Sequence, residues 1–419
     1  MLKNKNISNK IWDVIVIGGG ASGMMASAVA SSLGKSVLLL DKNKELGEKL
    51  KITGGGRCNI TNNEPDIHKM LKVYGDGAPF LYTPFSIFGV KDTFSYFESR
   101  GLPLVIQARN RFFPKTEKAF DVYNVLHKEL LKNNVVIKTN CTVQGFIHKG
   151  NKIININTNQ GQFYAKSFVL ATGGMSHPET GSTGDGFNFL NDLGHSVSPS
   201  TPDIVPVSVK DDWVKGLSGT SLSFMKITFY MNEKKQFSKT GKILFTHFGL
   251  SGPLILNSAK SIKALLDKGE VTACIDMYPD TTIGDLEKKI IKIFDANKNK
   301  ILKTVVKEFS PEGMHHAVES LLSFIDMNTK VHSIKKEDRR KIVDLLKALP
   351  LTVSGLMGYD RSVVVDGGVD VSEIDMKTMR SKIFANLFVT GDLLHLNRNS
   401  GGYSLQICWT TGYIAGMSV

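Results

Sequence analysis

Hydrophobic and polar positions divide the start of the chain into a strand, a helix and a second strand. The apolar run Trp12–Ile17 is rich in β-branched residues, as strands buried in a parallel sheet are. Small and apolar residues without proline continue from Met24 to Leu33, which predicts a helix. A second apolar run, Ser36–Leu40, follows and ends in Asp41. The pattern predicts a β-α-β unit.

A glycine-rich turn, GGGASG at residues 18–23, joins the first strand to the helix and satisfies GxGxxG. Its first glycine permits a tight turn, its third lets the backbone approach a pyrophosphate, and its last lets the helix pack on the strand. The helix N-terminus offers free N–H groups to phosphates. Asp41 lies 18 residues past Gly23 (41 − 23), where a carboxylate can bind ribose hydroxyls. The cofactor contacts predicted here are Gly18, Gly20, Ala21, Ser22, Gly23, Asp41 and Lys42.

This unit alone does not distinguish FAD from NAD, but three more glycine-bearing segments do. They are KLKITGGGRCNITN (residues 49–62), SFVLATGGMSHPETGSTGDG (residues 167–186) and NLFVTGDLL followed by SGGYSLQ (residues 386–394 and 400–406). Three consecutive glycines followed by Arg and Cys suit a loop whose backbone lies flush against a flat ligand. The last segment ends a strand at an acidic residue and then opens a helix with two glycines.

Through GGGRCN-x-TN the chain resembles a family of bacterial FAD-binding flavoproteins, the NAD(P)/FAD-dependent oxidoreductases, related to the fumarate reductase and glutathione reductase superfamily. The resemblance covers essentially the whole chain and includes ARNRFFPKTEKAFDV (108–122), FTHFGLSGPLIL (245–256) and GGV (367–369). It implies FAD as the cofactor. The further FAD contacts predicted with it are Gly55, Gly56, Arg57, Cys58, Asn59, Thr61, Ala171, Thr172, Gly173, Gly391, Asp392, Gly401, Gly402, Tyr403, Ser404 and Leu405.

Two of these contacts carry a chemical expectation. In flavoproteins of this superfamily an acid such as Asp392 holds the ribityl or pyrophosphate end of FAD. If the helix that follows Gly402 points its N-terminus at the flavin, its dipole stabilises the anionic reduced flavin. The chain departs from the family pattern nearby. Members have a D-x-D-G-like stretch where this chain has His395 and Asn397, and Asn where it has Ser404.

The cofactor motifs occupy residues 13–62, 167–186 and 386–412, with a long stretch between the last two. A turn-rich break, SPSTP, opens that stretch, and β-like runs then give way to a helical pattern. We predict an α/β fold in which residues 1–199 and 356–419 form a discontinuous FAD-binding Rossmann-like domain of the glutathione reductase type. Residues 200–355 are predicted to be an insertion, which the resemblance implies is a mixed β-barrel plus a small helical domain that covers the flavin.

Composition narrows the compartment and the kinds of site. The four cysteines are far apart and form no CxxC, which argues against a disulfide framework, a redox-disulfide relay and a structural zinc site. No His/Cys/Asp cluster has metal-ligand spacing, so no metal is expected. The basic N-terminus leads into an apolar run that ends at Ile17, too short for a signal peptide, and no membrane-spanning stretch follows. A cytoplasmic enzyme is expected, and nothing in the sequence specifies its oligomeric state.

The net charge of +13 has two explanations that the sequence leaves open. Scattered lysines are typical of an AT-biased genome, but they also suit an anionic partner such as RNA. Arg109 and Arg111 precede Phe112 and Phe113. These two arginines are equally compatible with a phosphate or base contact and with a solvated surface.

Catalytic candidates are few. Cys58 is expected to protonate the substrate or tune the flavin, and His247 in FTHFGLSGP to donate a proton or anchor the substrate. Each has a structural alternative, since small thiols and lone histidines are often core residues. No second GxGxxG follows a strand. NADH or NADPH is therefore expected as a transient donor that visits the flavin and leaves.

Three functions remain open. The leading prediction is an FAD oxidoreductase, reduced by NAD(P)H, that passes hydride to an unsaturated organic acceptor. The resemblance implies uridine in ribosomal RNA, reduced to dihydrouridine, as one acceptor, and the positive charge favours an RNA modification enzyme. The first alternative is an amine oxidase of the aminoacetone type that releases hydrogen peroxide. The second is a non-catalytic, flavin-bearing RNA-binding protein.

Overall fold

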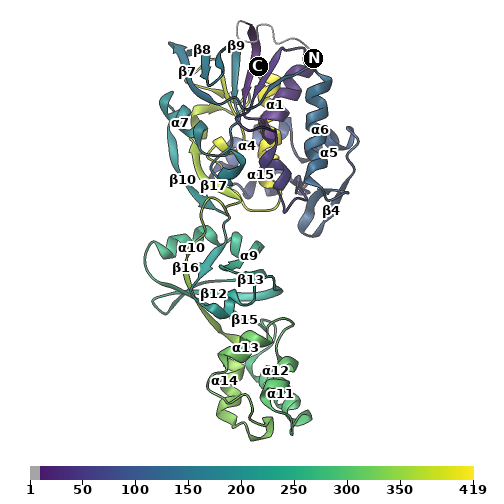
Figure 1. Cartoon of the computed structure of the whole chain (residues 1–419), viewed down its shortest axis with the longest axis vertical. Coiled ribbons are helices and arrows are strands. Elements are labelled where there is room, and N and C mark those ends of the chain that lie inside the picture. Colours follow the sequence, from purple (N-terminus) through teal and green to yellow (C-terminus); the bar gives the residue numbers. More distant parts are fainter. Residues whose placement is uncertain (1–9) are drawn as a thin grey trace. The chain divides into compact units, whose positions relative to one another are not determined.

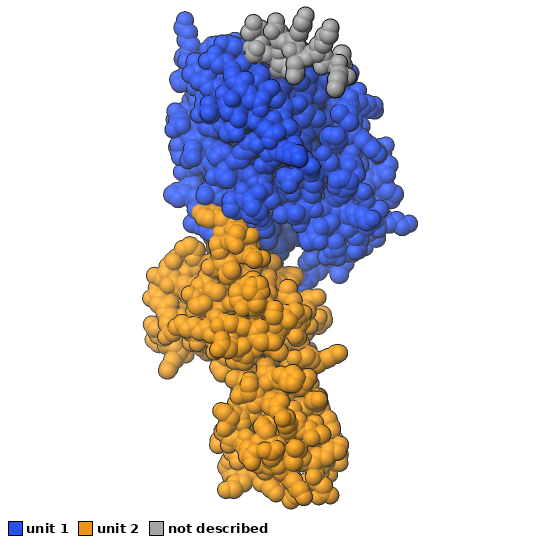
Figure 2. Space-filling model, in the orientation of Figure 1, with its two compact units in different colours: residues 1–202, 362–419 blue, residues 203–361 orange. Residues whose placement is uncertain are grey.

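A computed structural model describes residues 10–419; residues 1–9, the basic start of the N-terminal segment considered above, lie outside the described residues. The chain forms two compact units, shown in different colours in Figure 2. The first comprises the chain up to Pro202 together with Ser362–Val419, and the second comprises Asp203–Arg361. The first unit is therefore discontinuous in sequence. The predicted insertion, residues 200–355, overlaps the second unit.

A nine-stranded sheet forms the centre of the first unit (Figure 1). Its parallel strands are, in spatial order, β20 (Leu387–Val389), β9 (Gly161–Leu170), β1 (Ile11–Ile17), β2 (Val37–Leu40) and β6 (Val136–Lys138). Four antiparallel strands extend it, namely β7 (Val143–Lys149), β8 (Lys152–Thr158), β18 (Ile374–Asp375) and β19 (Arg380–Ser381). The Val/Ile/Leu runs of β1 and β2 are buried, as parallel strands covered on both faces are.

The register of this sheet brings together chain segments that are far apart in sequence. Ile17 pairs with Leu170, and Leu170 with Val389, so β1, β9 and β20 end side by side. The loops that leave these three strands therefore start at one edge of the sheet. Ligands of open parallel sheets bind at this carboxyl edge.

Helices α1 (Ala21–Ser32) and α15 (Tyr403–Ser418) pack closely against each other. A Cβ on Gly412 would lie 2.5 Å from the Ser22 oxygen, and one on Gly416 would lie 2.6 Å from the Ala26 oxygen. Glycine at these two positions, one helical turn apart, is what permits the close approach.

The first unit contains further helices and two small sheets. The helices are α2 (Glu48–Ile52), α3 (Ile67–Lys72), α4 (Ala78–Ile87), α5 (Val90–Glu98), α6 (Ala119–Lys132) and α7 (Asp185–Asp192). The small sheets are β3 (Thr61–Asn62) with β5 (Arg111–Pro114) and β4 (Leu104–Gln107), and β10 (Val197–Asp203) with β17 (Val364–Val369).

The second unit combines a closed barrel with a group of helices. The barrel strands are, in order, β11 (Val207–Val209), β14 (Gly249–Ser251), β13 (Lys234–Thr246), β12 (Ser221–Met231), β15 (Val271–Asp276) and β16 (Leu349–Leu356). A barrel was predicted, but not this pairing: every pair of neighbours is antiparallel, so the barrel is not mixed.

Seven helices accompany the barrel in the second unit. They are α8 (Asp212–Lys215), α9 (Pro253–Leu256), α10 (Ala259–Leu266), α11 (Ile283–Ala296), α12 (Leu302–Phe309), α13 (His315–Leu321) and α14 (Lys336–Lys347). Barrel residues such as Phe229 and helix residues such as Ile290 and Val343 belong to one buried hydrophobic cluster.

Candidate functional site

In the turn that follows β1, two glycines pack tightly against backbone atoms and a third has free space beside it. A Cβ on Gly18 would lie 2.5 Å from the Ala171 oxygen, and one on Gly23 would lie 1.9 Å from the Gly18 oxygen. Nothing lies within 4 Å of a Cβ added to Gly20, which precedes α1. The helix has no side-chain cap and no acidic residue in its first turn. Its first N–H groups, beginning at Ala21, therefore face an opening that suits an anion such as a pyrophosphate.

Asp41 ends β2 beside this turn and is almost completely buried. One carboxylate oxygen accepts the Gly19 N–H at 2.7 Å, and the other accepts the Asn43 N–H at 2.7 Å. Burial raises the pKa of Asp41 despite these two hydrogen bonds. Because each oxygen has a second lone pair, the carboxylate can still accept a hydrogen bond from a ribose hydroxyl.

Lys42, the next residue, is held by protein groups. Its ammonium lies 2.7 Å from the Asp185 carboxylate and also donates to Thr183. Lys42 thus ties the end of β2 to the start of α7. Its predicted cofactor contact stays a prediction, and that contact would have to compete with Asp185.

The glycine loop at residues 54–58 has an unusual backbone. Gly54, Gly55 and Gly56 have φ angles of 59°, 66° and 82°, and Cys58 has a φ of 59°. Nothing lies within 4 Å of a Cβ added to Gly55 or Gly56. Left-handed backbone at a non-glycine residue is costly and is found mostly where function requires it. The loop presents bare backbone to open space, as a surface for a flat ring would.

The residues after the glycines differ in their burial and in their hydrogen bonds. Cys58 is fully buried, and burial raises the pKa of its thiol to about 12, so the thiol stays protonated at neutral pH. Thr61 is also fully buried, and its hydroxyl donates to Gln406 at 2.6 Å, which ties β3 to α15. The Asn59 Oδ1 atom is shielded from solvent and has no hydrogen-bond partner. Asn59 therefore has an acceptor left for a ligand, while the Thr61 hydroxyl is already used.

The ATGG segment continues from β9 along the same edge of the sheet. Ala171 contacts Gly18, and a Cβ on Gly173 would lie 3.7 Å from the Lys49 ammonium. The Thr172 hydroxyl is buried without a hydrogen-bond partner. This segment thus contributes one more unsatisfied polar group beside the glycine turn.

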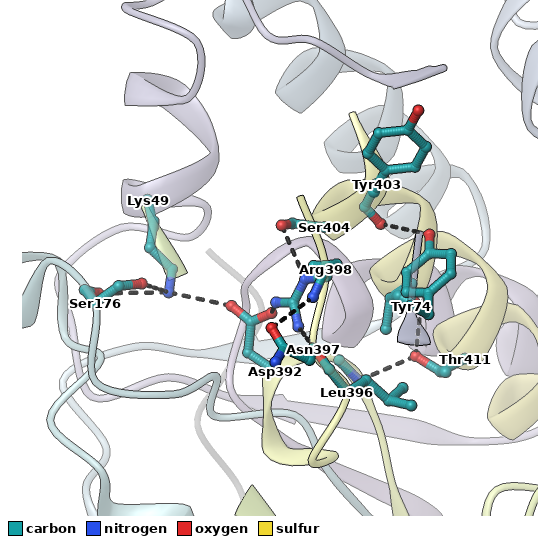
Figure 3. Close-up of polar contacts among 12 residues, drawn as sticks. Lys49, Tyr74, Ser176, Asp392, Leu396, Asn397, Arg398, Tyr403, Ser404 and Thr411 are labelled. Carbon is teal, nitrogen blue, oxygen red and sulfur yellow. Dashed lines mark hydrogen bonds and ion pairs between the residues drawn. The ribbon is translucent and has the colours of Figure 1, made fainter. Parts of the chain in front are cut away.

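A buried ion-pair cluster surrounds Asp392 (Figure 3). The Arg398 guanidinium contacts one oxygen of Asp392, and the Lys49 ammonium lies 3.6 Å from the other. Arg398 also donates to the Leu396 carbonyl at 2.6 Å and to the Ser404 hydroxyl at 2.9 Å. Burial alone would raise the pKa of Asp392, but the charges of Arg398 and Lys49 outweigh it and lower that pKa. Asp392 is therefore ionised and fixed in position.

Arg398 and Lys49 were not predicted as site residues. The sequence did contain a signal for Arg398: in HLNRN a basic residue stands three residues before Gly401, the first of the two glycines that open α15. No local pattern could reveal its acidic partner, because Asp392 and Arg398 approach each other only through the fold of the intervening loop.

The start of α15 completes this end of the first unit. Gly401 and Gly402 have φ angles of 136° and 99°, and a Cβ on Gly402 would lie 2.4 Å from the Thr61 carbonyl carbon. The first turn of α15 contains no acidic residue. Ser404 binds Arg398, as described above, and Leu405 is partly exposed. The partial positive charge on the first N–H groups of α15 is therefore not neutralised by an acidic side chain, and it can stabilise an anion bound at this end of the helix.

His247 lies in the second unit, at the exposed turn between β13 and β14. Its ring makes an edge contact with Phe248, with centroids 5.0 Å apart. Its predicted catalytic role stays a prediction.

A family model described as "HI0933-like protein Rossmann domain" matches residues 12–418. The chain belongs to this family. A 3-dehydro-bile acid delta(4,6)-reductase of Clostridium scindens is 29% identical over 409 residues, covering 96% of this chain and 97% of that protein. A ribosomal RNA dihydrouridine synthase of Haemophilus influenzae is 27% identical over 411 residues, covering 97% of this chain and 98% of that protein.

Solved structures share the fold of this HI0933-like chain. The open conformation of a flavocytochrome c3 fumarate reductase superposes with a TM-score of 0.54 at 17% identity, covering 98% of this chain and 78% of that one. A 3-ketosteroid-delta4-(5alpha)-dehydrogenase from Rhodococcus jostii RHA1 gives a TM-score of 0.54 at 14% identity, covering 99% and 98%. The predicted α/β Rossmann-type fold and the class of FAD-dependent oxidoreductase are confirmed.

The first unit of this HI0933-like protein fits FAD in its donor set. It offers an open helix N-terminus for a pyrophosphate, a buried carboxylate for a ribose and a bare glycine loop for a flat ring. The loops after β1, β9 and β20 converge, since Gly18 contacts Ala171 and a Cβ on Gly391 would lie 2.8 Å from the Ser22 hydroxyl.

Residues 10–419 contain neither a candidate metal site nor a candidate membrane-spanning helix. No three His, Cys, Asp or Glu side chains are grouped so as to hold a metal ion. In the same range, none of the helices has the length and apolar character needed to cross a membrane.

Proposed function

We propose that this protein is reduced by NAD(P)H and passes hydride to a carbon–carbon double bond conjugated to a carbonyl group, with uridine in ribosomal RNA as the acceptor. The observation that carries the proposal is the pair of relatives that match along the whole chain. Their names specify different substrates, but a 3-dehydro delta(4,6)-reductase and a dihydrouridine synthase both saturate a double bond conjugated to a carbonyl. Shared chemistry on different substrates is what a common flavin site predicts.

Uridine in RNA is preferred over a steroid because of charge. The chain has 52 Lys and Arg against 39 Asp and Glu, a net charge of +13. Phosphate neutralisation by Lys and Arg is the main source of affinity for nucleic acids. A bile acid carries a single carboxylate, whereas RNA carries one phosphate per nucleotide, so RNA gains more from that excess.

FAD, when bound, supplies a carrier that accepts hydride from NAD(P)H and donates it to the acceptor. In this proposal the N–H groups of α1 hold its pyrophosphate, Asp41 binds its ribose, and Asp392 binds its ribityl chain. The N-terminus of α15 stabilises negative charge that develops near it, because its first N–H groups and dipole are not neutralised by an acid.

The reaction adds one hydride to the β-carbon of the acceptor and one proton to its α-carbon. In this proposal Tyr403, predicted above only as an FAD contact, is the proton donor in place of Cys58. Within residues 10–419 its hydroxyl makes no hydrogen bond, and Figure 3 shows that hydroxyl pointing away from Arg398. Burial, together with the charge of Glu64, raises the pKa of Tyr403, so the phenol is protonated at neutral pH. Cys58, by contrast, has no exposed surface.

The test is anaerobic stopped-flow spectroscopy of the FAD-loaded protein. NADH or NADPH is expected to bleach the flavin absorbance, and ribosomal RNA lacking dihydrouridine is expected to restore it faster than buffer does. Dihydrouridine in the recovered RNA would identify the product. If an amine reduces the flavin without any nucleotide, and oxygen admitted afterwards reoxidises it with release of hydrogen peroxide, the amine oxidase alternative is correct. If neither nucleotide reduces the flavin, the oxidoreductase mechanism proposed here is wrong.

A further inference from the structure

Three arginines meet beside the start of α15 in the first unit. Arg57 follows the glycine loop, and Arg109 and Arg111 flank the turn that leads into β5. The guanidinium of Arg57 lies over the Phe113 ring, 4.8 Å from its centroid. Stacking on an aromatic face leaves the N–H edge of a guanidinium free to bind an anion.

The positive charge of this cluster is poorly balanced. The acid beside it is Glu117, 4.0 Å from Arg57, and both side chains are about half exposed. Among residues 10–419, the side chains of Arg109 and Arg111 make no hydrogen bond and no ion pair. Burial lowers the pKa of Arg111, and the charges of Arg109 and Arg57 lower it further. Arg57 and Arg109 are thus each close enough to Arg111 to repel its charge.

Arg111 has a feature that a solvated surface does not explain. Its Nε atom is shielded from solvent and has no hydrogen-bond partner. An N–H group removed from water without an acceptor destabilises the fold, and more so when the group is charged. A ligand oxygen at this position would remove that cost.

The turn that carries Arg109 is strained and tied to the cofactor end. Arg109 and Asn110 have φ angles of 64° and 56°, in the left-handed region that favours glycine. The Asn62 side-chain amide donates to the Arg109 carbonyl and to the Gly401 carbonyl, each at 3.2 Å. Asn62 therefore fixes the arginine cluster to the loop that opens α15.

We infer that Arg57, Arg109 and Arg111 form a phosphate-binding site for the RNA acceptor, next to the predicted flavin end of the cofactor site. The inference rests on the proposed function. A guanidinium binds a phosphodiester through two parallel N–H···O bonds, and phosphate contacts set the position of a nucleic acid without reading its bases. The site thus holds the nucleotide chain while the target base enters beside the Tyr403 hydroxyl.

A polymeric phosphate fits the surroundings better than a small carboxylate does. The surface next to the glycine loop has the exposed lysines Lys115 and Lys118 and a Phe120 ring that is 53% exposed. The Ala119 N–H, between the last two, binds the Gly56 carbonyl at 2.7 Å. Cations alternating with an exposed aromatic ring are the usual surface for single-stranded RNA.

The experiment measures RNA binding by the full-length, FAD-loaded protein without a reductant. Fluorescence anisotropy of a labelled oligouridylate is followed at several salt concentrations for the natural protein and the double variant Arg109→Gln/Arg111→Gln. A matched control, Lys303→Gln/Lys307→Gln, removes two exposed charges from α12 in the second unit. Flavin absorbance and the thermal midpoint of each variant verify that it folds and retains FAD.

The arginine variant is expected to bind at least about tenfold more weakly at 0.1 M salt, with a salt slope lower by about one to two. The control variant is expected to change affinity less than about twofold. A single Arg111→Lys variant keeps the positive charge but loses the paired N–H donors of the guanidinium. Its affinity for oligouridylate is expected to lie between those of the natural protein and the double variant. Equal affinities and slopes for the natural protein and the arginine variant would overturn the inference.

Two further measurements distinguish a phosphate ligand from a carboxylate ligand, and a failure of this inference from a failure of the proposed reaction. If benzoate displaces oligouridylate as effectively as inorganic phosphate does, and the arginine variant binds RNA normally, the site takes small carboxylates and the RNA assignment is wrong. If the arginine variant loses RNA affinity but RNA never reoxidises the reduced natural protein, the phosphate site stands and the proposed reaction fails.

Discussion

Replacing Arg398 with methionine tests whether the buried cluster around Asp392 is held together by charge. The Arg398 side chain is 2% exposed and that of Asp392 is 12% exposed. Removing one member of a buried ion pair leaves an uncompensated charge and typically costs 3–5 kcal/mol. Lys49 remains 3.6 Å from Asp392 and offsets part of that loss. We therefore expect Arg398→Met to lower the free energy of unfolding of the first unit by about 3 kcal/mol.

The pH dependence of this loss has a definite sign. In the natural protein Arg398 and Lys49 lower the pKa of Asp392, so Asp392 stabilises the fold above its unfolded pKa, and this contribution is lost as pH falls through the folded value. Without Arg398 the pKa of Asp392 in the folded chain rises. The buried carboxyl of the variant then takes up a proton at a higher pH, which removes the uncompensated charge. The difference in stability between the two proteins must therefore shrink on acidification.

Urea unfolding followed by tryptophan fluorescence can measure this in the first unit alone. Trp12 and Trp409 are buried there, while Trp213 belongs to the second unit, so a Trp213→Phe background confines the signal. Arg380→Met removes an exposed arginine from the same unit and is the control. The double variant Asp392→Asn/Arg398→Met is expected to recover part of the stability. A loss for Arg398→Met below about 1 kcal/mol, or one independent of pH, would refute the reasoning.

Three more outcomes follow from the same geometry. Gly20→Ala should fold normally but bind FAD more weakly, because its Cβ enters open space before α1, whereas Gly23→Ala should fail to fold stably; urea unfolding and FAD titration distinguish them. Cys58 should resist iodoacetamide at pH 8 in the folded chain, as followed by mass spectrometry, because it is buried and its thiol pKa is about 12. Tyr403→Phe should lower the rate of flavin reoxidation by RNA on the order of 100-fold without changing FAD affinity, whereas Cys58→Ser should retain most of that rate.

Features that depend on the backbone were predictable from the sequence, because glycines and apolar runs restrict the local conformation directly. The strand predicted at Trp12–Ile17 is β1, the helix predicted from Met24 is α1, and the steric roles of Gly18 and Gly23 follow from contacts with backbone atoms. The helical pattern predicted after the β-like runs of the insertion likewise matches α11 to α14. Glycine patterns and apolar periodicity are local, and they survive tertiary packing.

Side-chain partners were not predictable, because they depend on loops that meet only in the folded chain. Thr61 was expected to contact FAD, but its hydroxyl is bound to Gln406, from the far end of the sequence. Lys42 is bound to Asp185. Cys58 was predicted either to act on the substrate or flavin or to be a core residue; the structure buries it completely, on a left-handed backbone.

The departures from the family pattern illustrate why such partners matter. Where family members have a D-x-D-G-like stretch, this chain has His395 and Asn397, and Arg398 follows them. Each basic side chain among them has an acidic partner: His395 lies 3.2 Å from Asp366, and Arg398 contacts Asp392. The change of charge is therefore balanced within the first unit, and it places a fixed cation against the acid expected to hold FAD. Since Asp392 stays ionised and its neighbours complete their hydrogen bonds, the substitution is compatible with cofactor binding and reshapes the charge beside the start of α15.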